Sequence, residues 1–318
     1  MSCRVAALCV VLSITIYPVE GVMAEPTFVA IEVEGAPADD AGLRERVARM
    51  RGYLDDEDAR FDAIAAVSEL TELRAYAGDR SGLLAERREI LSMIGSVVSR
   101  SATIPFEDGL EPLAEIMTLE AGDDRPVKRR MFDHYAYAEL ASDYATLPGH
   151  GASHDLAAEQ YGKAAALADQ LDGFDDNQRA GMRQKQAYEL HEAGRYDEAL
   201  SLNQGVLETG ERLFGPNDPQ LITVLTNIAQ NLHALGRKPA AEPYLVRVQT
   251  IAEAEGDLET VQDMLFQRGV LSYELGRFDE ARSFMRDRID RLRTADETEL
   301  LATAMEDYEE LERRIGGQ

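Results

Sequence analysis

The chain reads GRYDEA at residues 194–199, GRKPAA at 236–241 and GRFDEA at 276–281. Successive glycines of this motif are 42 and 40 residues apart. A motif that recurs at such a period is the signature of a solenoid, in which each unit packs only on its neighbours. The stretch therefore predicts a stack of similar supersecondary units.

Each shared position suits a turn between two helices. The glycine can take the left-handed backbone conformation that ends one helix. The alanine five residues later lets the two helices cross closely, because its side chain is small. The repeat-defining residues are therefore the three glycines and their alanines, namely Gly194, Gly236, Gly276, Ala199, Ala241 and Ala281.

Apolar side chains follow helical periodicity on both sides of Gly236. They recur at spacings of three and four residues, as on one face of a helix. The residues are Leu221, Leu225, Ile228, Leu232 and Leu235 before the glycine, and Ala241, Tyr244, Leu245, Val248 and Ile251 after it. One helix pair cannot bury both stripes, so neighbouring pairs must stack.

These segments resemble tetratricopeptide repeats, in the longer form known from kinesin light chains. The resemblance covers residues 177–293 and includes LFGPNDP at 213–219, which is similar to that form's inter-repeat turn. It implies an all-α fold, an α-solenoid of stacked antiparallel helix pairs that forms a right-handed superhelix and ends in a capping helix. The chain departs from the family pattern in having no tryptophan and in placing Lys238 where the motif has an aromatic residue.

Weaker signs of the same organisation lie on both sides of the repeats. Residues 41–176 are expected to form degenerate helical repeats, with early helices near 41–54, 57–76, 80–101 and 108–120. Residues 294–318 are expected to form the C-terminal capping helix. The sequence TADE at 294–297 has the pattern of a capping box that begins this helix.

The first 24 residues have the pattern of an export signal. Arg4 is followed by an apolar run at 5–17, and Ala24 ends a Val-Met-Ala cleavage sequence. The run is shorter than the roughly 20 residues that span a bilayer, and an uncleaved anchor is the alternative. We therefore expect a signal peptide at 1–24 and a periplasmic or secreted bacterial protein. Cys3 and Cys9 both lie in this segment, so a cleaved chain would have no disulfide and no thiol nucleophile.

Residues 25–40 are expected to form an extended, flexible leader. Its segment FVAIEV at 28–33 has strand-like residues, but a lone strand has no sheet to join in a helical protein. The segment is therefore either a loose leader or a strand that pairs with the exposed edge of a partner.

The chain is strongly acidic. It has 59 acidic and 33 basic residues, a formal net charge of −26. Such a surface repels phosphate backbones and anionic lipid headgroups, which argues against nucleic acid or a membrane surface as the partner. Strong solvation and low self-association are the simpler explanation of this charge, and a basic partner is the alternative.

The resemblance also implies a contact surface, because in this family the first helix of each repeat lines a concave groove that touches a peptide or a partner helix. Nine side chains are expected there: Lys185, Tyr188, His191, Asn227, Gln230, His233, Phe266, Gln267 and Tyr273. The alternative is that these residues line the groove without contacting anything.

The sequence contains no phosphate-binding loop, nucleophile elbow or metalloprotease helix motif. We therefore expect a non-enzymatic scaffold that binds an unidentified protein or peptide, with no cofactor and no metal. One alternative is an enzyme whose site lies in residues 25–176, with the repeats as an appendage. Another is a carrier of a small ligand or metal that uses His191 and His233, although adjacent repeats about 10 Å apart separate the two imidazoles.

Overall fold

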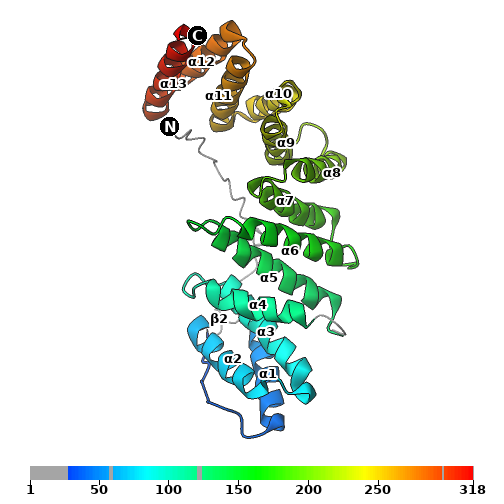
Figure 1. Cartoon of the computed structure of the whole chain (residues 1–318). Coiled ribbons are helices and arrows are strands. Elements are labelled where there is room, and N and C mark those ends of the chain that lie inside the picture. The colour runs from blue at the N-terminus through cyan, green and yellow to red at the C-terminus, as the bar shows by residue number, and fades with distance from the viewer. Residues whose placement is uncertain (1–27, 57–59, 120–123, 296, 318) are drawn as a thin grey trace, which may run out of the picture.

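The computed structural model describes residues 28–56, 60–119, 124–295 and 297–317 of the chain. Within these ranges the chain forms thirteen α-helices (Figure 1). They are α1 (Asp40–Asp55), α2 (Ala63–Ala77), α3 (Leu84–Ser99), α4 (Glu107–Thr118), α5 (Val127–Ala145), α6 (Ser153–Ala168), α7 (Asp176–Glu192), α8 (Tyr196–Phe214), α9 (Ile222–Ala234), α10 (Lys238–Glu255), α11 (Leu258–Glu274), α12 (Phe278–Thr294) and α13 (Thr298–Gly316). The 3₁₀ turns η1 (Ser81–Leu83) and η2 (Pro219–Leu221) precede α3 and α9.

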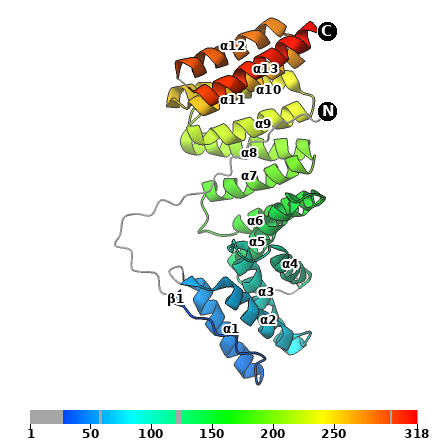
Figure 2. The same cartoon turned by 90° about the vertical axis from the view of Figure 1, so that its left-hand side faces the viewer.

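The helices stack as pairs along one elongated row (Figure 2). Each helix from α5 to α12 packs on the helix before it and the helix after it in the chain. At the N-terminal end α3 contacts α1, α2, α4 and α5, so the row is broader there. The prediction of an all-α solenoid of stacked antiparallel helix pairs is confirmed. At the C-terminal end of the solenoid, α13 packs on α12.

The turns within the three repeats share one backbone geometry. Gly194, Gly236 and Gly276 have φ angles of 77°, 71° and 74°, in the left-handed region that favours glycine. The arginine that follows each glycine donates its backbone N–H to the carbonyl five residues earlier. This bond satisfies an acceptor that the helix end would otherwise leave open.

Three ion pairs connect the beginnings of successive even-numbered helices. They join Arg195 to Asp155 at 3.1 Å, Arg237 to Asp197 at 3.0 Å and Arg277 to Glu242 at 3.0 Å. Exposed pairs of this kind contribute little to stability. The first two pairs join residues 40 apart and the third joins residues 35 apart, and together they show that the beginnings of α6, α8, α10 and α12 lie next to one another in that order.

The largest apolar cluster lies in the N-terminal region, where the sequence repeat is weakest. It joins residues of α1 to α5, including Leu43, Leu70, Ile90 and Leu113. A Cβ on Gly95 would come within 2.5 Å of Leu113, so α3 and α4 approach each other closely at this glycine. A second large cluster fills the repeats from α8 to α11.

Part of the strand-like segment pairs within this chain, so the expectation of a loose leader is wrong for Phe28 and Val29. Strand β1 (Phe28–Val29) lies parallel to strand β2 (Arg60–Phe61), with Phe28 opposite Arg60. Beyond β1 the backbone N–H of Glu34 donates to Glu69, and Arg46 donates to the carbonyl of Gly35 at 2.7 Å. These contacts hold residues 28–35 against α1 and α2. The helix expected over 57–76 begins only at Ala63, because β2 precedes it.

The expected capping box at 294–297 was also wrong. Thr294 is the last residue of α12, and its hydroxyl donates to the Asp290 carbonyl of that same helix at 2.8 Å. Helix α13 begins at Thr298, and its N-cap Glu297 makes no side-chain capping bond. A true capping box begins α7, where Asp175 and Gln178 each accept from the other's backbone N–H.

The expected signal peptide, its cleavage point at Ala24 and both cysteines lie outside the described residues. Of the helices that the structure does describe, none combines the length and apolar character needed to cross a membrane.

Candidate protein-interaction surface

The nine residues expected at a contact surface lie on three odd-numbered helices, and we refer to them together as the predicted contact face. Helix α7 carries Lys185, Tyr188 and His191, α9 carries Asn227, Gln230 and His233, and α11 carries Phe266, Gln267 and Tyr273. The structure thus distributes them over three successive repeats, as the period of the sequence implied.

The two histidines of this face connect neighbouring repeats. His191 Nδ1 lies 2.8 Å from Asn231 Oδ1, which joins α7 to α9. His233 Nε2 lies 2.5 Å from Glu274 Oε2, which joins α9 to α11. Burial acts to raise the pKa of Glu274, but His233 and Lys238 outweigh it and lower that pKa. Each histidine therefore has a structural contact, and the described residues contain no group of three side chains that could hold a metal ion.

Lys185 belongs to a polar cluster that joins α5, α6 and α7. Its ammonium lies 2.7 Å from Glu139 and within 6 Å of the ring centroids of Tyr135 and Tyr161. The hydroxyl of Tyr161 donates to the same Glu139 carboxylate. Burial and the charge of Glu139 both raise the pKa of Tyr161 far above its ordinary value. Lys185 is therefore engaged within the fold.

A second buried cluster lies one helical turn further along the same helices. The Glu189 carboxylate is 2.6 Å from Ser142 Oγ and 2.7 Å from His154 Nδ1. Burial raises the pKa of Glu189, while His154 and Ser142 act to lower it. A serine nucleophile needs the histidine between itself and the carboxylate. Here the carboxylate separates the serine from the histidine, so this arrangement does not activate Ser142.

The remaining residues of the predicted contact face differ in exposure. Tyr188 is 36% exposed, and Gln230 is exposed as well. Phe266 packs instead with the cluster of Ala281 and Met285, and the Arg288 guanidinium lies 5.0 Å from its ring. The rings of Tyr273 and Phe278, the first residue of the next helix, have centroids 5.7 Å apart and are tilted by 44°.

Three amides of this face make no hydrogen bond to any residue that the structure describes. They belong to Asn227 and Gln230 of α9 and to Gln267 of α11. Asn227 and Gln267 are nine residues before their repeat glycines, so they occupy equivalent positions. The face therefore offers open donors and acceptors at a spacing of one repeat.

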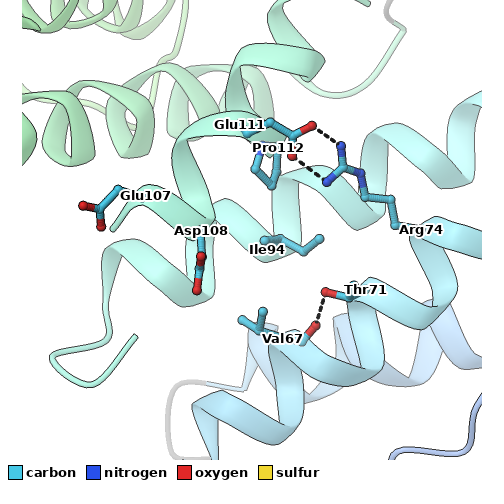
Figure 3. A pocket seen from close by; sticks show the side chains of 8 residues that line it. All are labelled: Val67, Thr71, Arg74, Ile94, Glu107, Asp108, Glu111 and Pro112. Atoms are coloured by element: carbon cyan, nitrogen blue, oxygen red, sulfur yellow. Dashed lines mark hydrogen bonds and ion pairs between the residues drawn. The ribbon is translucent and has the colours of Figure 1, made fainter. Parts of the chain in front are cut away.

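Two open clefts lie elsewhere on the described part of the chain, between even-numbered helices. The first, of about 300 Å³, is between α2 and α4, with Ile94 of α3 beneath it. Figure 3 shows Arg74 reaching across from α2 to Glu111 of α4. The second, of about 480 Å³, is between α6 and α8, with Gln186 and Leu190 of α7 beneath it. None of the nine predicted residues lines either cleft.

Neither cleft was predicted from the sequence, although one signal for the second was present. The residue eight positions before the repeat glycine is Gln186, Ile228 or Arg268 in successive repeats. Ile228 is buried in the apolar core, whereas the other two are polar. The three repeats thus differ at this position, where the side chain is neutral and polar, apolar, or positively charged.

Residues 185–254 match the sequence model of the tetratricopeptide repeat family. The tetratricopeptide assignment made from the sequence is therefore confirmed for this part of residues 177–293. No curated protein matches the chain in sequence.

Several solved structures are similar in fold at low identity. BtubC (BKLC) from P. vanneervenii is 14% identical, with a TM-score of 0.46 over 67% of this chain and 92% of that one. A kinesin-light-chain candidate with nearly identical TPR-like repeats from Podosopora anserina is 16% identical, with a TM-score of 0.43 over 68% and 98%. The apo form of RapI is 13% identical, with a TM-score of 0.45 over 87% and 99%.

Proposed function

We propose that this chain is a non-enzymatic scaffold that binds a protein or peptide partner through the predicted contact face, and that it acts in the periplasm or outside the cell. The tetratricopeptide match at 185–254 supports a role in protein interaction. The N-terminal sequence pattern supports export.

The observation that carries the binding proposal is the set of open amides at Asn227, Gln230 and Gln267. An extended peptide presents a backbone N–H and a carbonyl at each residue, and these groups need partners when they leave water. Amide side chains can both donate and accept. Tyr188, one repeat away from Gln230, adds a large side chain that can contribute apolar contact.

The alternative of an enzyme in residues 25–176 finds no support in the described part of that region. Helices α1 to α6 pack on one another, and α6 packs on α7, so the described part of this region joins the row of helices. The carrier alternative would use His191 and His233, but one ring nitrogen of each already contacts another residue, Asn231 and Glu274 respectively.

A photo-crosslinking experiment tests the binding proposal. The photoreactive residue p-benzoylphenylalanine would replace Tyr188, and in a control chain it would replace Val246. The two side chains are 36% and 38% exposed, but Val246 lies on the even-numbered helix α10. We expect the Tyr188 position to capture a defined partner and the Val246 position to capture none.

The Asn227→Ala and Gln267→Ala variants should then reduce capture at position 188. If both variants capture the partner as well as the parent chain does, the predicted contact face is not the binding surface.

Export is tested separately by sequencing the N-terminus of the protein from a cell envelope extract. A mature chain that begins at Glu25 is expected, and a chain that retains residues 1–24 in the cytoplasm would contradict export.

A further inference from the structure

Helix α13, at the end of the row (Figure 2), can be aligned with the odd-numbered helices of the repeats. Gly316 is 40 residues after Gly276, which continues the spacing of the repeat glycines. Leu271 and Leu311 are each five residues before their glycine, and both are buried. Leu271 belongs to an apolar cluster that includes residues of α10, and Leu311 belongs to one that includes residues of α12. Helix α13 therefore packs on α12 as α11 packs on α10.

The other side of α13 is open, whereas the same side of the earlier odd-numbered helices is covered. The residues at 11 positions before the repeat glycine are Leu225 in α9, Leu265 in α11 and Met305 in α13. Leu225 is fully buried and Leu265 is 1% exposed, but Met305 is 46% exposed. Among the described residues, α13 packs mainly on α12. An apolar position that is covered in two repeats is thus uncovered on α13.

The side chain that covers this position in the repeats comes from the even-numbered helix that follows. Phe284 of α12 packs on a cluster formed by Leu265 and Val261 of α11 with Ala252 of α10. Phe284 therefore covers α11 and the even-numbered helix before it with one large side chain.

The equivalent residues of the two earlier repeats are also large and apolar. Leu202 of α8 and Tyr244 of α10 are eight residues after their repeat glycines, as Phe284 is. Each packs on an apolar cluster that includes the preceding odd-numbered helix. One large apolar side chain at a fixed place in each even-numbered helix thus closes each repeat.

An ion pair accompanies this packing. Arg237 is seven residues before Tyr244, and it pairs with Asp197 of α8 at 3.0 Å. Asp279 of α12 is three residues after its repeat glycine, as Asp197 is, and its side chain is fully exposed. Its one ion pair among the described residues is with Arg282 of the same helix, at 3.2 Å. Exposed pairs of this kind are weak, so Asp279 remains available to a cation from outside.

We infer that the open side of α12 and α13 binds an amphipathic helix of a partner protein. The partner helix has an arginine at its beginning and a large apolar residue seven positions later, as α8, α10 and α12 have. Its apolar side chain covers Met305, and its arginine pairs with Asp279. Seven residues of helix are about 10 Å long, so the two contacts lie about two turns apart on the partner.

A second copy of this chain does not offer such a helix. The arginines at the beginnings of α8, α10 and α12 already have ion pairs within the stack. The apolar side chains seven residues after them are already packed on their own clusters. The helix must therefore come from another protein.

This site is separate from the predicted contact face. None of the nine residues of that face belongs to α12 or α13. A partner at the end of the row and a partner on the contact face can thus be measured independently. Failure of the proposal for the contact face would leave this inference untouched.

The test is an NMR titration of the full chain, labelled at its methionine methyl groups, with a synthetic peptide of the sequence 277–294. This peptide has Arg277 and Phe284 at the required spacing. We expect the methyl signal of Met305 to shift as the peptide binds. A Phe284→Ala peptide should bind at least about tenfold more weakly, and an Arg277→Glu peptide about threefold more weakly. Equal binding of the parent and Phe284→Ala peptides, or shifts that leave Met305 unchanged, would overturn the inference.

A pair of chain variants makes the test specific to α13. Met305→Glu places a charge where the apolar side chain of the partner packs, and it should weaken peptide binding at least about tenfold. The control Val246→Glu makes a similar change at a position of α10 that is 38% exposed, and it should leave the affinity unchanged. Fluorescence anisotropy of the labelled peptide measures both affinities. Unaltered binding to a Met305→Glu chain that has a native circular dichroism spectrum contradicts the proposal.

Self-association is the other way in which this surface could be covered. Dilution of the chain without peptide should leave the Met305 methyl signal unchanged. A shift that depends on the concentration of the chain would assign the surface to a second copy and overturn the inference.

Discussion

His191 of α7 contacts Asn231 of α9, with 2.8 Å between Nδ1 and Oδ1, and the Asn231 side chain is fully buried. The contact joins equivalent ends of two first helices. The Nδ2 of Asn231 has no hydrogen-bond partner among the described residues. Within that part of the chain, the side chain of Asn231 therefore hydrogen-bonds through its Oδ1 to His191.

We predict that Asn231→Ala lowers the free energy of unfolding by about 1–3 kcal/mol, because it removes a buried hydrogen-bond partner. Urea denaturation followed by circular dichroism measures the change. Gln230→Ala, at the exposed neighbouring position, should stay within about 0.5 kcal/mol of the parent. A double variant with His191→Ala should lose about 0.5–1.5 kcal/mol less than the sum of the single losses. Strict additivity would show that the two side chains do not interact.

Two glycine substitutions should change stability in opposite directions. Gly95→Ala places a Cβ within 2.5 Å of Leu113, so it should destabilise the chain by about 1–3 kcal/mol. Gly52→Ala, in α1, meets no atom within 4 Å and should stabilise the chain by up to about 1 kcal/mol through helix propensity. Thermal unfolding compares the two. Equal effects would mean that α3 and α4 do not approach closely at Gly95.

Asp133 should make stability depend on pH in the acidic range. Burial raises its pKa from 3.8 to about 6, although Arg125 at 2.9 Å and the Ser92 hydroxyl act against the rise. The folded chain therefore binds a proton that the unfolded chain has already lost between these two values. This group's contribution to stability is present at low pH and is lost as the pH rises through 6.

The Asp133→Asn variant tests this dependence. The stability of the parent relative to the variant should be greater at pH 4.5 than at pH 6.5, by about 1–2 kcal/mol. Urea unfolding at the two pH values measures it. If the difference in unfolding free energy between parent and variant is the same at both pH values, Asp133 ionises as an exposed carboxyl does.

The buried pair of Arg46 and Glu69 should be more important to stability than the exposed pairs. The two groups are 2.6 Å apart, and Glu69 also accepts the backbone N–H of Glu34. Glu69→Ala leaves Arg46 buried without its carboxylate, which typically costs about 3–5 kcal/mol. The exposed pair of Arg293 and Asp290 is the control, and Arg293→Ala should cost less than about 1 kcal/mol.

Hydrogen exchange gives a second measurement for Glu69→Ala. The Glu34 amide should exchange faster in this variant, because its acceptor is lost. Protection at Glu34 that remains unchanged would contradict the contact between residues 28–35 and α2.

The sequence allowed the helix stack to be predicted because its decisive positions are local. Gly194, Gly236 and Gly276 need a left-handed backbone that few other residues adopt, and the apolar stripes beside Gly236 require neighbours. The β1–β2 ladder could not be predicted in this way. Two-residue strands have no periodicity to detect, and their position depends on the distant pair of Arg46 and Glu69.

The contact surface was only partly accessible to the same reasoning. The period placed Asn227 and Gln267 at equivalent positions. It could not show that Lys185 contacts Glu139, because these residues are 46 apart and do not follow the period of 40–42. The cleft between α6 and α8 is lined by side chains of three helices, α6, α7 and α8, so the period of the sequence alone could not predict it.

The ion pairs between even-numbered helices have a consequence for how the length of this chain can change. Removal of residues 195–236 would join Gly194 directly to Arg237 and keep the Gly-Arg turn intact. Arg237 would then lie where Arg195 now lies, within reach of Asp155. Addition of one unit would re-form the same pair in the same way. We therefore expect duplication or loss of a whole unit to preserve this turn and this pair, so that the span of the molecule can change in steps of one repeat.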